Sequence, residues 1–295
     1  MRLAVLADVH GNLPALEAVL TDIQQYGVDG IIVAGDLITG GPQPIETMHL
    51  LRSLGGWMIR GNTDNYLLDY DAGEAPDAWR ASSQWAVMRW SYFHLDRVTL
   101  DFIASLPEQQ AVDLPGTAPI RVVHGSPRHP AEPLFPDRDP LTLRVARKAD
   151  LLPPDRAPMP LDAVLAQINE PVLACGHTHI PWQQEQARGL VFNPGAVCGA
   201  LNGDTRAQYA LLTWQDHHWS VEHRAVPYDL DRIRAAFRAS GLLVEGGALA
   251  RAFLLSIETG QNIGSYLLAH AHPPLPPPAY GGAGGGTARG WLRGL

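Results

Sequence analysis

The chain has 295 residues, 46% of them hydrophobic and 18% charged, enough to bury a core in one large domain or one domain with appendages. With 30 acidic residues against 22 Lys and Arg, its net charge of −8 lacks the basic face that long nucleic acid requires. A small phosphorylated molecule is compatible with this charge.

Cysteine content and hydropathy exclude further classes of protein. Cys175 and Cys198 are too few for a disulfide framework and lack metal-ligand spacing, so we expect both to be buried apolar residues. No apolar stretch approaches the roughly 18 residues of a membrane helix, and the chain begins with a strand pattern rather than a signal peptide. We expect a cytoplasmic protein with no membrane partner.

The first strand pattern ends in an acidic and a basic side chain. An apolar run from Leu3 leads into Asp8, His10 and Gly11, which predicts a buried strand stopped by a turn. Because strand side chains alternate, Asp8 and His10 would point at one spot if the extended geometry continued past Val9. An aspartate at this place can equally cap a helix, so the pair needs partners downstream.

Two further strands end in polar residues. A helix over Leu13–Tyr26, with Asn12 as N-cap, leads to a strand over Gly30–Ala34 that ends in Asp36. A helix and a third strand ending in Asn62 follow (Ile45–Ser53 and Gly56–Ile59). Strand–helix–strand spacing indicates parallel strands, whose carboxyl ends share one edge of a sheet, where open α/β sheets bind ligands.

The middle of the chain predicts helices, two strands and an insertion. Ala75–Ser105 is predicted to be helical, with its tryptophans packed (Trp79, Trp85 and Trp90). Strands are expected around Gln110–Asp113 and over Ile120–Val123, the second ending in His124. Residues 127–160 are proline-rich apart from a helix predicted over Asp139–Asp150. We expect this insertion to be a substrate-facing lid.

The last third begins with a strand over Pro171–Cys175, which ends in Gly176-His177-Thr178-His179. Short strands are then predicted as an antiparallel continuation (Pro181–Glu185, Leu190–Asn193, Ala207–Trp214 and His218–Ala225). A C-terminal helical appendage is predicted over 226–272 (Asp229–Ser240, Glu245–Ser256 and Gln261–His270). The Pro- and Gly-rich composition of 273–295 predicts a disordered tail.

The polar side chains at these strand ends have the composition of a two-metal site. They are imidazoles, carboxylates and one amide, without a thiolate: Asp8, His10, Asp36, Asn62, His124, His177 and His179. Two divalent ions roughly 3.5–4 Å apart clamp the attacking and leaving oxygens of phosphoryl transfer. Mixed N/O ligands suit Mn, Fe, Co, Ni or Zn better than Mg or Ca. A polar cap on a loop is the alternative for any single residue.

These residues resemble the motif blocks of the calcineurin-like metallophosphoesterases, D-x-H, G-D, G-N-x-[DE], H and G-H-x-H. The matches occur in the family's order: Asp8-Val9-His10, Gly35-Asp36, Gly61-Asn62-Thr63-Asp64, His124 and Gly176-His177-Thr178-His179. The resemblance covers residues 1–225. It implies an α/β fold, a β-sandwich of mixed sheets flanked by helices in four αββα layers, followed by the appendage. His124–Arg128 and Asn193–Val197 look like the small bacterial phosphodiesterase branch, which is similar to the retromer scaffold subunit.

The resemblance also implies roles for the motif residues. Two divalent ions are expected, manganese first, with Fe, Zn, Ni or Co as alternatives. One ion would be held by Asp8, His10, Asp36 and His179, and the other by Asp36 as a bridge with Asn62, His124 and His177. A hydroxide bridging the ions would attack a small, nucleotide-like phosphodiester or phosphomonoester in line. Asp64 would orient ligands from behind them, as a partner of a ligating histidine does.

The sequence departs from the family at Thr63, where many members have a histidine that assists the leaving group. Threonine is not a proton donor of suitable pKa near neutrality, so leaving groups of low pKa or another donor are expected. The small bacterial branch often lacks this histidine too. His129 is our candidate donor and Arg128 our candidate ligand for the phosphoryl oxygens. Each is alternatively an ordinary loop residue.

A second function class is a metal-binding interaction scaffold with little or no catalysis, as in the retromer scaffold subunit. Its contacts would be the C-terminal helices and tail, through which two copies of this chain could also pair. The presence of every metal-ligand residue favours the enzyme. A structural α/β domain with coincidental polar residues is the weakest alternative.

Overall fold

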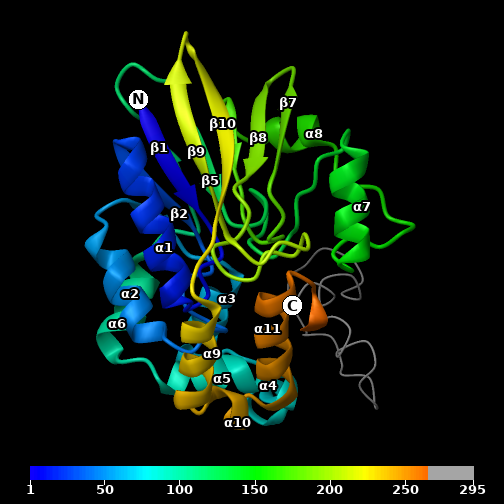
Figure 1. Ribbon diagram of the computed structural model, residues 1–295. Coiled ribbons are helices and arrows are strands. Elements are labelled where there is room, and N and C mark those ends of the chain that lie inside the picture. Colours follow the sequence, from blue (N-terminus) through cyan, green and yellow to red (C-terminus); the bar gives the residue numbers. More distant parts are fainter. Residues whose placement is uncertain (265–295) are drawn as a thin grey trace.

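The computed structural model describes residues 1–264 as two sheets packed face to face with helices outside them (Figure 1). The strands are β1 (Arg2–Leu6), β2 (Gly30–Ala34), β3 (Trp57–Ile59), β4 (Gln109–Val112), β5 (Ile120–Val123), β6 (Val172–Ala174), β7 (Trp182–Gln186), β8 (Gly189–Asn193), β9 (Ala207–Gln215) and β10 (His218–Val226). The helices are α1 (Leu13–Ile23), α2 (Pro44–Ser53), α3 (Asn62–Ala72), α4 (Asp77–Ala81), α5 (Ala86–Phe93), α6 (Arg97–Ser105), α7 (Pro140–Lys148), α8 (Leu161–Leu165), α9 (Leu230–Ala239), α10 (Leu242–Glu245) and α11 (Gly247–Thr259), with short 3₁₀ turns η1 (Gln24–Tyr26) and η2 (Ser83–Trp85).

The first sheet has the order β10-β9-β1-β2-β3, and its strands β1, β2 and β3 are parallel, as predicted. The second sheet has the order β4-β5-β6-β8-β7. The expected antiparallel continuation is confirmed for the pairs β7–β8 and β9–β10 and is wrong for the pairing of β8 with β6. The strands after His179 divide between the sheets, because β8 pairs parallel to β6 whereas β9 pairs antiparallel to β1.

Alternation along β1 decides what each of its faces buries. Leu3 and Val5 pack into the apolar layer between the two sheets, together with Phe192 of β8. Ala4 and Leu6 lie on the opposite face, in the cluster beneath the helices that cover the first sheet. Helix α8 covers the outer face of the second sheet. These layers confirm the αββα sandwich.

Local capping explains where several helices begin. Asn12 caps α1 as predicted, because its side chain accepts the N–H of Ala15 at 3.1 Å. The predicted helical stretch Ala75–Ser105 is interrupted at Ser82, which is extended and caps η2, and again before α6 at Asp96. The tryptophans of this stretch are buried, as are both cysteines.

The C-terminal helices pack onto the rest of the domain. Phe237 of α9 and Ile257 of α11 are buried in one cluster with Trp90 of α5. Ion pairs add to this packing, since Arg232 of α9 contacts Glu17 of α1 at 2.8 Å. The helix predicted over Glu245–Ser256 is divided near Gly246 into α10 and α11.

Some expectations fall outside the described residues. The predicted helix Gln261–His270 lies partly there, and the predicted tail 273–295 lies there entirely. Among residues 1–264, none of the helices has both the length and the apolar character needed to cross a membrane.

Because Phe237 is fully buried between the C-terminal helices and α5, Phe237→Ala should lower the free energy of unfolding by about 3–5 kcal/mol. Val244→Ala is the matched control, since Val244 lies on the neighbouring α10 and is 82% exposed. Its effect should stay within about 0.5 kcal/mol. Urea unfolding followed by circular dichroism measures both. A negligible effect of Phe237→Ala would show that these helices do not unfold with the domain.

Candidate metal centre

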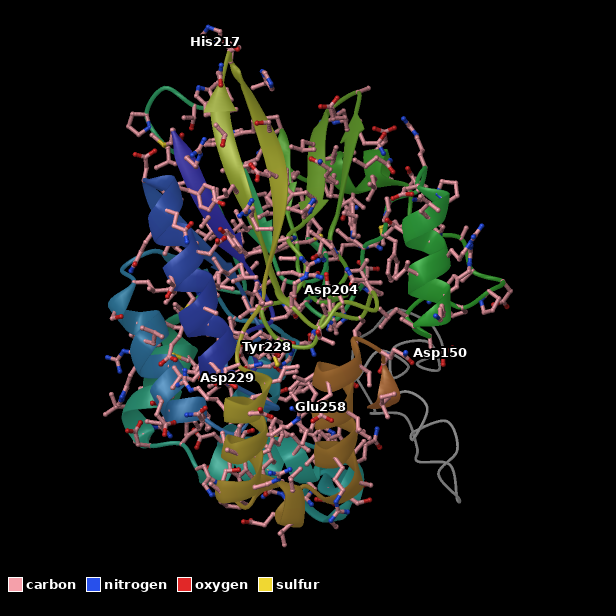
Figure 2. All side chains as sticks on the ribbon, viewed as in Figure 1. Asp150, Asp204, His217, Tyr228, Asp229 and Glu258 are labelled. Atoms are coloured by element: carbon pink, nitrogen blue, oxygen red, sulfur yellow. The ribbon has the colours of Figure 1, made fainter. Side chains whose placement is uncertain are left out.

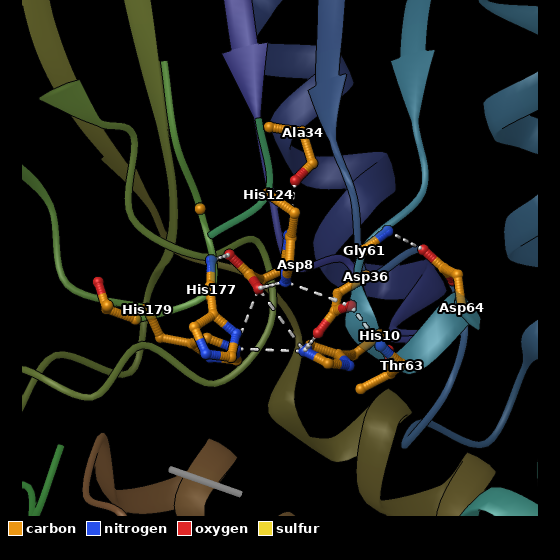
Figure 3. A network of polar contacts seen from close by, with 12 residues as sticks. Asp8, His10, Ala34, Asp36, Gly61, Thr63, Asp64, His124, His177 and His179 are labelled. Atoms are coloured by element: carbon orange, nitrogen blue, oxygen red, sulfur yellow. Dashed lines mark hydrogen bonds and ion pairs between the residues drawn. The ribbon is translucent and has the colours of Figure 1, made fainter. Parts of the chain in front are cut away.

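The seven predicted ligands come from both sheets and from the turns after their strands. Asp8 and His10 follow β1, Asp36 follows β2, and Asn62 begins α3 directly after β3. The second sheet contributes His124 after β5, and His177 and His179 after β6. The two carboxylates and four histidines converge on one small volume at the carboxyl ends of the strands (Figure 3).

The ligand atoms divide into the two groups that the resemblance implies. Asp8, His10 and His179 form one group, and Asp36, His124 and His177 form the other, with the ligand atoms of each group within 4.8 Å of one another. Asp36 lies between the groups. Its Oδ1 is 3.3 Å from Nε2 of His124, and its Oδ2 is 3.6 Å from Nε2 of His10. One carboxylate oxygen therefore faces each group, as a bridging ligand requires.

Backbone carbonyls fix the orientation of three histidines. Nδ1 lies 2.6 Å from the Thr39 carbonyl in His10, 2.7 Å from the Ala34 carbonyl in His124 and 2.8 Å from the Gly199 carbonyl in His179. A carbonyl only accepts, so each Nδ1 carries a hydrogen, and each Nε2 presents a lone pair whenever its imidazole is neutral. Such second contacts are typical of histidines that bind metal.

These lone pairs meet at close range. Nε2 of His10 lies 3.2 Å from Nε2 of His179, so two acceptors face each other unless a proton or a cation lies between them. Oδ1 of Asn62 is buried without a hydrogen-bond partner among the described residues. Within residues 1–264, the only close polar contacts of Oδ1 of Asp8 and Nε2 of His124 are with other side chains of the cluster, at 3.3 Å from His179 and Asp36. Buried polar atoms without partners cost free energy. The residues present fit a pair of divalent cations.

Burial and neighbouring charges set the protonation of the ligands. Burial lowers the pKa of His177 to about 4, so its imidazole is neutral and able to ligate at neutral pH. Against the effect of burial, the charge of Asp36 raises the pKa of His124 to about 9. His124 in turn overcomes the burial of Asp36 and lowers the pKa of that carboxylate. Metal binding would therefore displace a proton.

Most of these ligands have a left-handed backbone. Among the non-glycine residues with positive φ are Asp8 (55°), His10 (46°), Asp36 (53°), His177 (68°) and His179 (57°). Each such residue stores roughly 1–3 kcal/mol of strain, and such strain clusters at functional sites. Strand alternation beyond Val9 is thus the wrong reason for the convergence of Asp8 and His10, since β1 ends at Leu6 and a left-handed turn directs both side chains.

Asp64 supports the backbone rather than a histidine. Its carboxylate accepts the N–H of Gly61 at 2.8 Å and the N–H of Leu37 at 3.1 Å, so it fixes the residues beside Asn62 and Asp36. It also completes the capping of α3, a helix that was not predicted from the sequence. Burial, followed by the charge of Asp36, raises the pKa of Asp64 to about 7.

Thr63 and the candidates for the leaving group and the phosphoryl oxygens have different surroundings. Thr63 is buried, and its Oγ1 is unpartnered within the described chain. His129 lines a second cavity together with Asn62 and Tyr66. Arg128 is half exposed, and its Nε lies 2.9 Å from Oε2 of Glu132, with which it forms an ion pair.

A cavity of about 150 Å³ opens beside the ligands His10, Asp36, His177 and His179. Its other described walls come from the turn after β2, from Thr63 and Tyr66 of α3, from η2 and α5, from the residues around Gly199, and from α11 with the residues after it. None of its described lining residues belongs to the insertion 127–160, so that expectation of a substrate-facing lid is not met at this cavity. The apolar lining was missed because nothing in the sequence of α5 or α11 distinguishes a cavity face from a packed face.

Comparisons with known proteins agree with this geometry. The family model of the calcineurin-like phosphoesterase superfamily domain matches residues 1–217. The chain is 28% identical over 247 residues to the Methanocaldococcus jannaschii protein MJ0912, covering 78% of this chain and 89% of that protein. It is 24% identical over 222 residues to the phosphodiesterase YfcE of Escherichia coli, covering 72% and 87%.

A solved structure shares the architecture. The metallophosphoesterase from Sphaerobacter thermophilus superposes with a TM-score of 0.65 at 26% identity, covering 88% of this chain and all of that one (100%). The sandwich, the two ligand groups and the family match over residues 1–217 thus lead to one conclusion. The chain belongs to the calcineurin-like phosphoesterase superfamily.

Proposed function

We propose that the protein is a divalent-metal-dependent phosphoesterase that hydrolyses a small, nucleotide-like phosphodiester or phosphomonoester. One observation carries the proposal: Nε2 of His10 lies 3.2 Å from Nε2 of His179, within a buried cluster that also holds two carboxylates. Such a cluster is expensive to bury without cations. Manganese is the first candidate, because a mixed set of imidazole and carboxylate ligands suits it.

The chain's own residues would hold and orient the reactants. Two divalent ions, when bound, supply a water nucleophile of lowered pKa and neutralise the charge of the phosphoryl oxygens. Asp36 would help to hold both ions, and its Oδ1 is itself oriented by the N–H of Thr63 at 3.0 Å. Asp8 is oriented by the N–H of His177 at 3.0 Å from its Oδ2. Pre-oriented ligands of this kind need little rearrangement during the reaction.

The direct test is hydrolysis of bis(4-nitrophenyl) phosphate by the purified protein with Mn²⁺, before and after removal of metal by EDTA. Turnover should require the metal. His124→Ala and Asn62→Ala should each lower kcat by at least about 100-fold, because each removes a ligand. His217→Ala is the control, since His217 lies at the far tip of the β9–β10 hairpin (Figure 2).

Turnover that is unaffected in both ligand variants would show that the site is misassigned. Absence of turnover with every divalent ion, in protein shown to be folded, would instead favour the interaction scaffold.

His129 is the proposed proton donor to the leaving group, since it lines one cavity together with the ligand Asn62. His129→Ala should lower kcat strongly for alkyl phosphate esters, whose leaving groups need a proton, and only slightly for nitrophenyl esters. The rates of a series of esters graded in leaving-group pKa measure this difference. An equal loss along the whole series would contradict the role.

Arg128 is the proposed contact to the phosphoryl oxygens, and Glu132 holds its guanidinium in place. Arg128→Ala should raise KM for a phosphodiester several-fold with little change in kcat, because it removes a charge that binds the ground and transition states alike. Arg138→Ala is the control, since Arg138 is another exposed arginine of the insertion. Steady-state kinetics of the two variants decide the matter, and an unchanged KM would exclude Arg128.

A further inference from the structure

The cavity beside the metal ligands has two chemically different ends. One end is formed by the ligands themselves. The other is formed by apolar side chains from separate parts of the chain: Trp85, Val87, Met88, Leu201, Leu249 and Phe253. A substrate whose phosphoryl group lies at the ligands would place the group attached to its ester oxygen against this apolar end.

Helix α11 presents one face to the cavity. Leu249, Phe253 and Ser256 are spaced by four and three residues, so they lie on the same side of the helix, and all three line the cavity. Leu255 lies on the helix between them in sequence but is 46% exposed and does not line it. The helix is held by the buried Ile257.

Phe253 lies directly beside the metal ligands. Its ring centroid is 5.6 Å from that of His10, with the rings nearly perpendicular at 71°. The loop at Gly40 makes room for this ring, since a Cβ on Gly40 would come within 3.0 Å of Phe253. The α11 helix therefore brings an aromatic surface into contact with the metal centre.

Trp85 supplies a second aromatic surface. It is buried and stacks on Trp79 at 4.0 Å between ring centroids, and Tyr66 packs edge-on against it at 5.3 Å. These contacts hold the indole in one orientation, because stacked and edge-on pairs are the preferred aromatic geometries. This rigid aromatic wall favours an aromatic ligand over a flexible aliphatic one.

The size of the cavity suits one ring system. The volume of about 150 Å³ covers both ends of the cavity, and an apolar cavity of roughly that volume binds one benzene-sized ligand, so the apolar end admits no more than one small ring. Small-molecule sites of this type combine aromatic walls with few polar groups. We propose that the apolar end binds a planar aromatic group esterified to the scissile phosphate, and that Phe253 selects this group. The proposal rests on the proposed phosphoesterase function and narrows its substrate class from nucleotide-like esters, in which a sugar is attached to the phosphate, to aryl esters.

Binding of stable phosphonates tests the subsite separately from catalysis. Phenylphosphonate, cyclohexylphosphonate and methylphosphonate carry the same metal-binding head and differ in the group attached to phosphorus. Isothermal titration calorimetry of the Mn²⁺-loaded protein should show phenylphosphonate binding about 10-fold more tightly than methylphosphonate. Cyclohexylphosphonate should bind more weakly than phenylphosphonate, because the ring is not planar.

Variants on α11 then assign the effect to one side chain. Phe253→Ala should reduce the phenyl-to-methyl preference to about 2-fold while leaving the affinity for methylphosphonate unchanged, which also reports that the protein is folded. Phe253→Leu should keep an apolar wall but lose the preference for phenyl over cyclohexyl. Leu255→Ala is the matched control and should keep all three affinities.

Equal wild-type affinities for phenyl- and methylphosphonate, or a preference that survives Phe253→Ala, would overturn the subsite. Equal affinities for phenyl- and cyclohexylphosphonate would overturn the selection of a planar group. These affinities are measured apart from turnover. An intact preference without hydrolysis of any ester would therefore refute the proposed function alone, and normal hydrolysis without the preference would refute the subsite alone.

Discussion

The orientation of the histidines by backbone carbonyls is the constraint on which the centre depends. The carbonyls of Thr39, Ala34 and Gly199 accept hydrogen bonds from Nδ1 of three imidazoles, and Nε2 of each imidazole therefore points toward the centre. Those carbonyls belong to the ends of strands or to the turns after them. The positions of the Nε2 atoms consequently depend on how the two sheets pack. The buried layer between the sheets stabilises this cluster of histidines and carboxylates, whose burial is unfavourable by itself.

Which residues gather at one place could be predicted from the sequence, but the way they converge could not. Five motif blocks in order, each after an apolar run, were sufficient to select the seven residues and the αββα sandwich. Alternation along β1 predicted the right pair, Asp8 and His10, for the wrong reason. A left-handed φ at an aspartate or histidine depends on tertiary contacts, such as the bond from the N–H of His10 to the carbonyl of Asp36, which no local pattern encodes.

Long-range packing accounts for the other differences. The residues Gly61 to Asp64 form both a metal-ligand motif and the start of a helix. Only the motif was recognised from the sequence, so α3 was not predicted. The proline content of residues 127–160 predicted that this insertion faces the substrate, whereas the described walls of the cavity include α5 and α11. The insertion contacts a residue of the cavity wall: the carbonyl of Ala149 accepts a hydrogen bond at 3.0 Å from the side chain of Asn262, just after α11.

Helix α11 lies beyond residue 217, where the match to the family model ends, yet it contributes Leu249 and Phe253 to the cavity beside the ligands. Part of the surface that would meet the rest of the substrate thus lies outside the stretch of chain that carries the ligand motifs. Under the proposed subsite, substitutions on one face of α11 would change which organic groups are accepted while every motif residue and its carbonyl partner stayed the same. A new substrate range would then arise from a part of the chain that the family does not define.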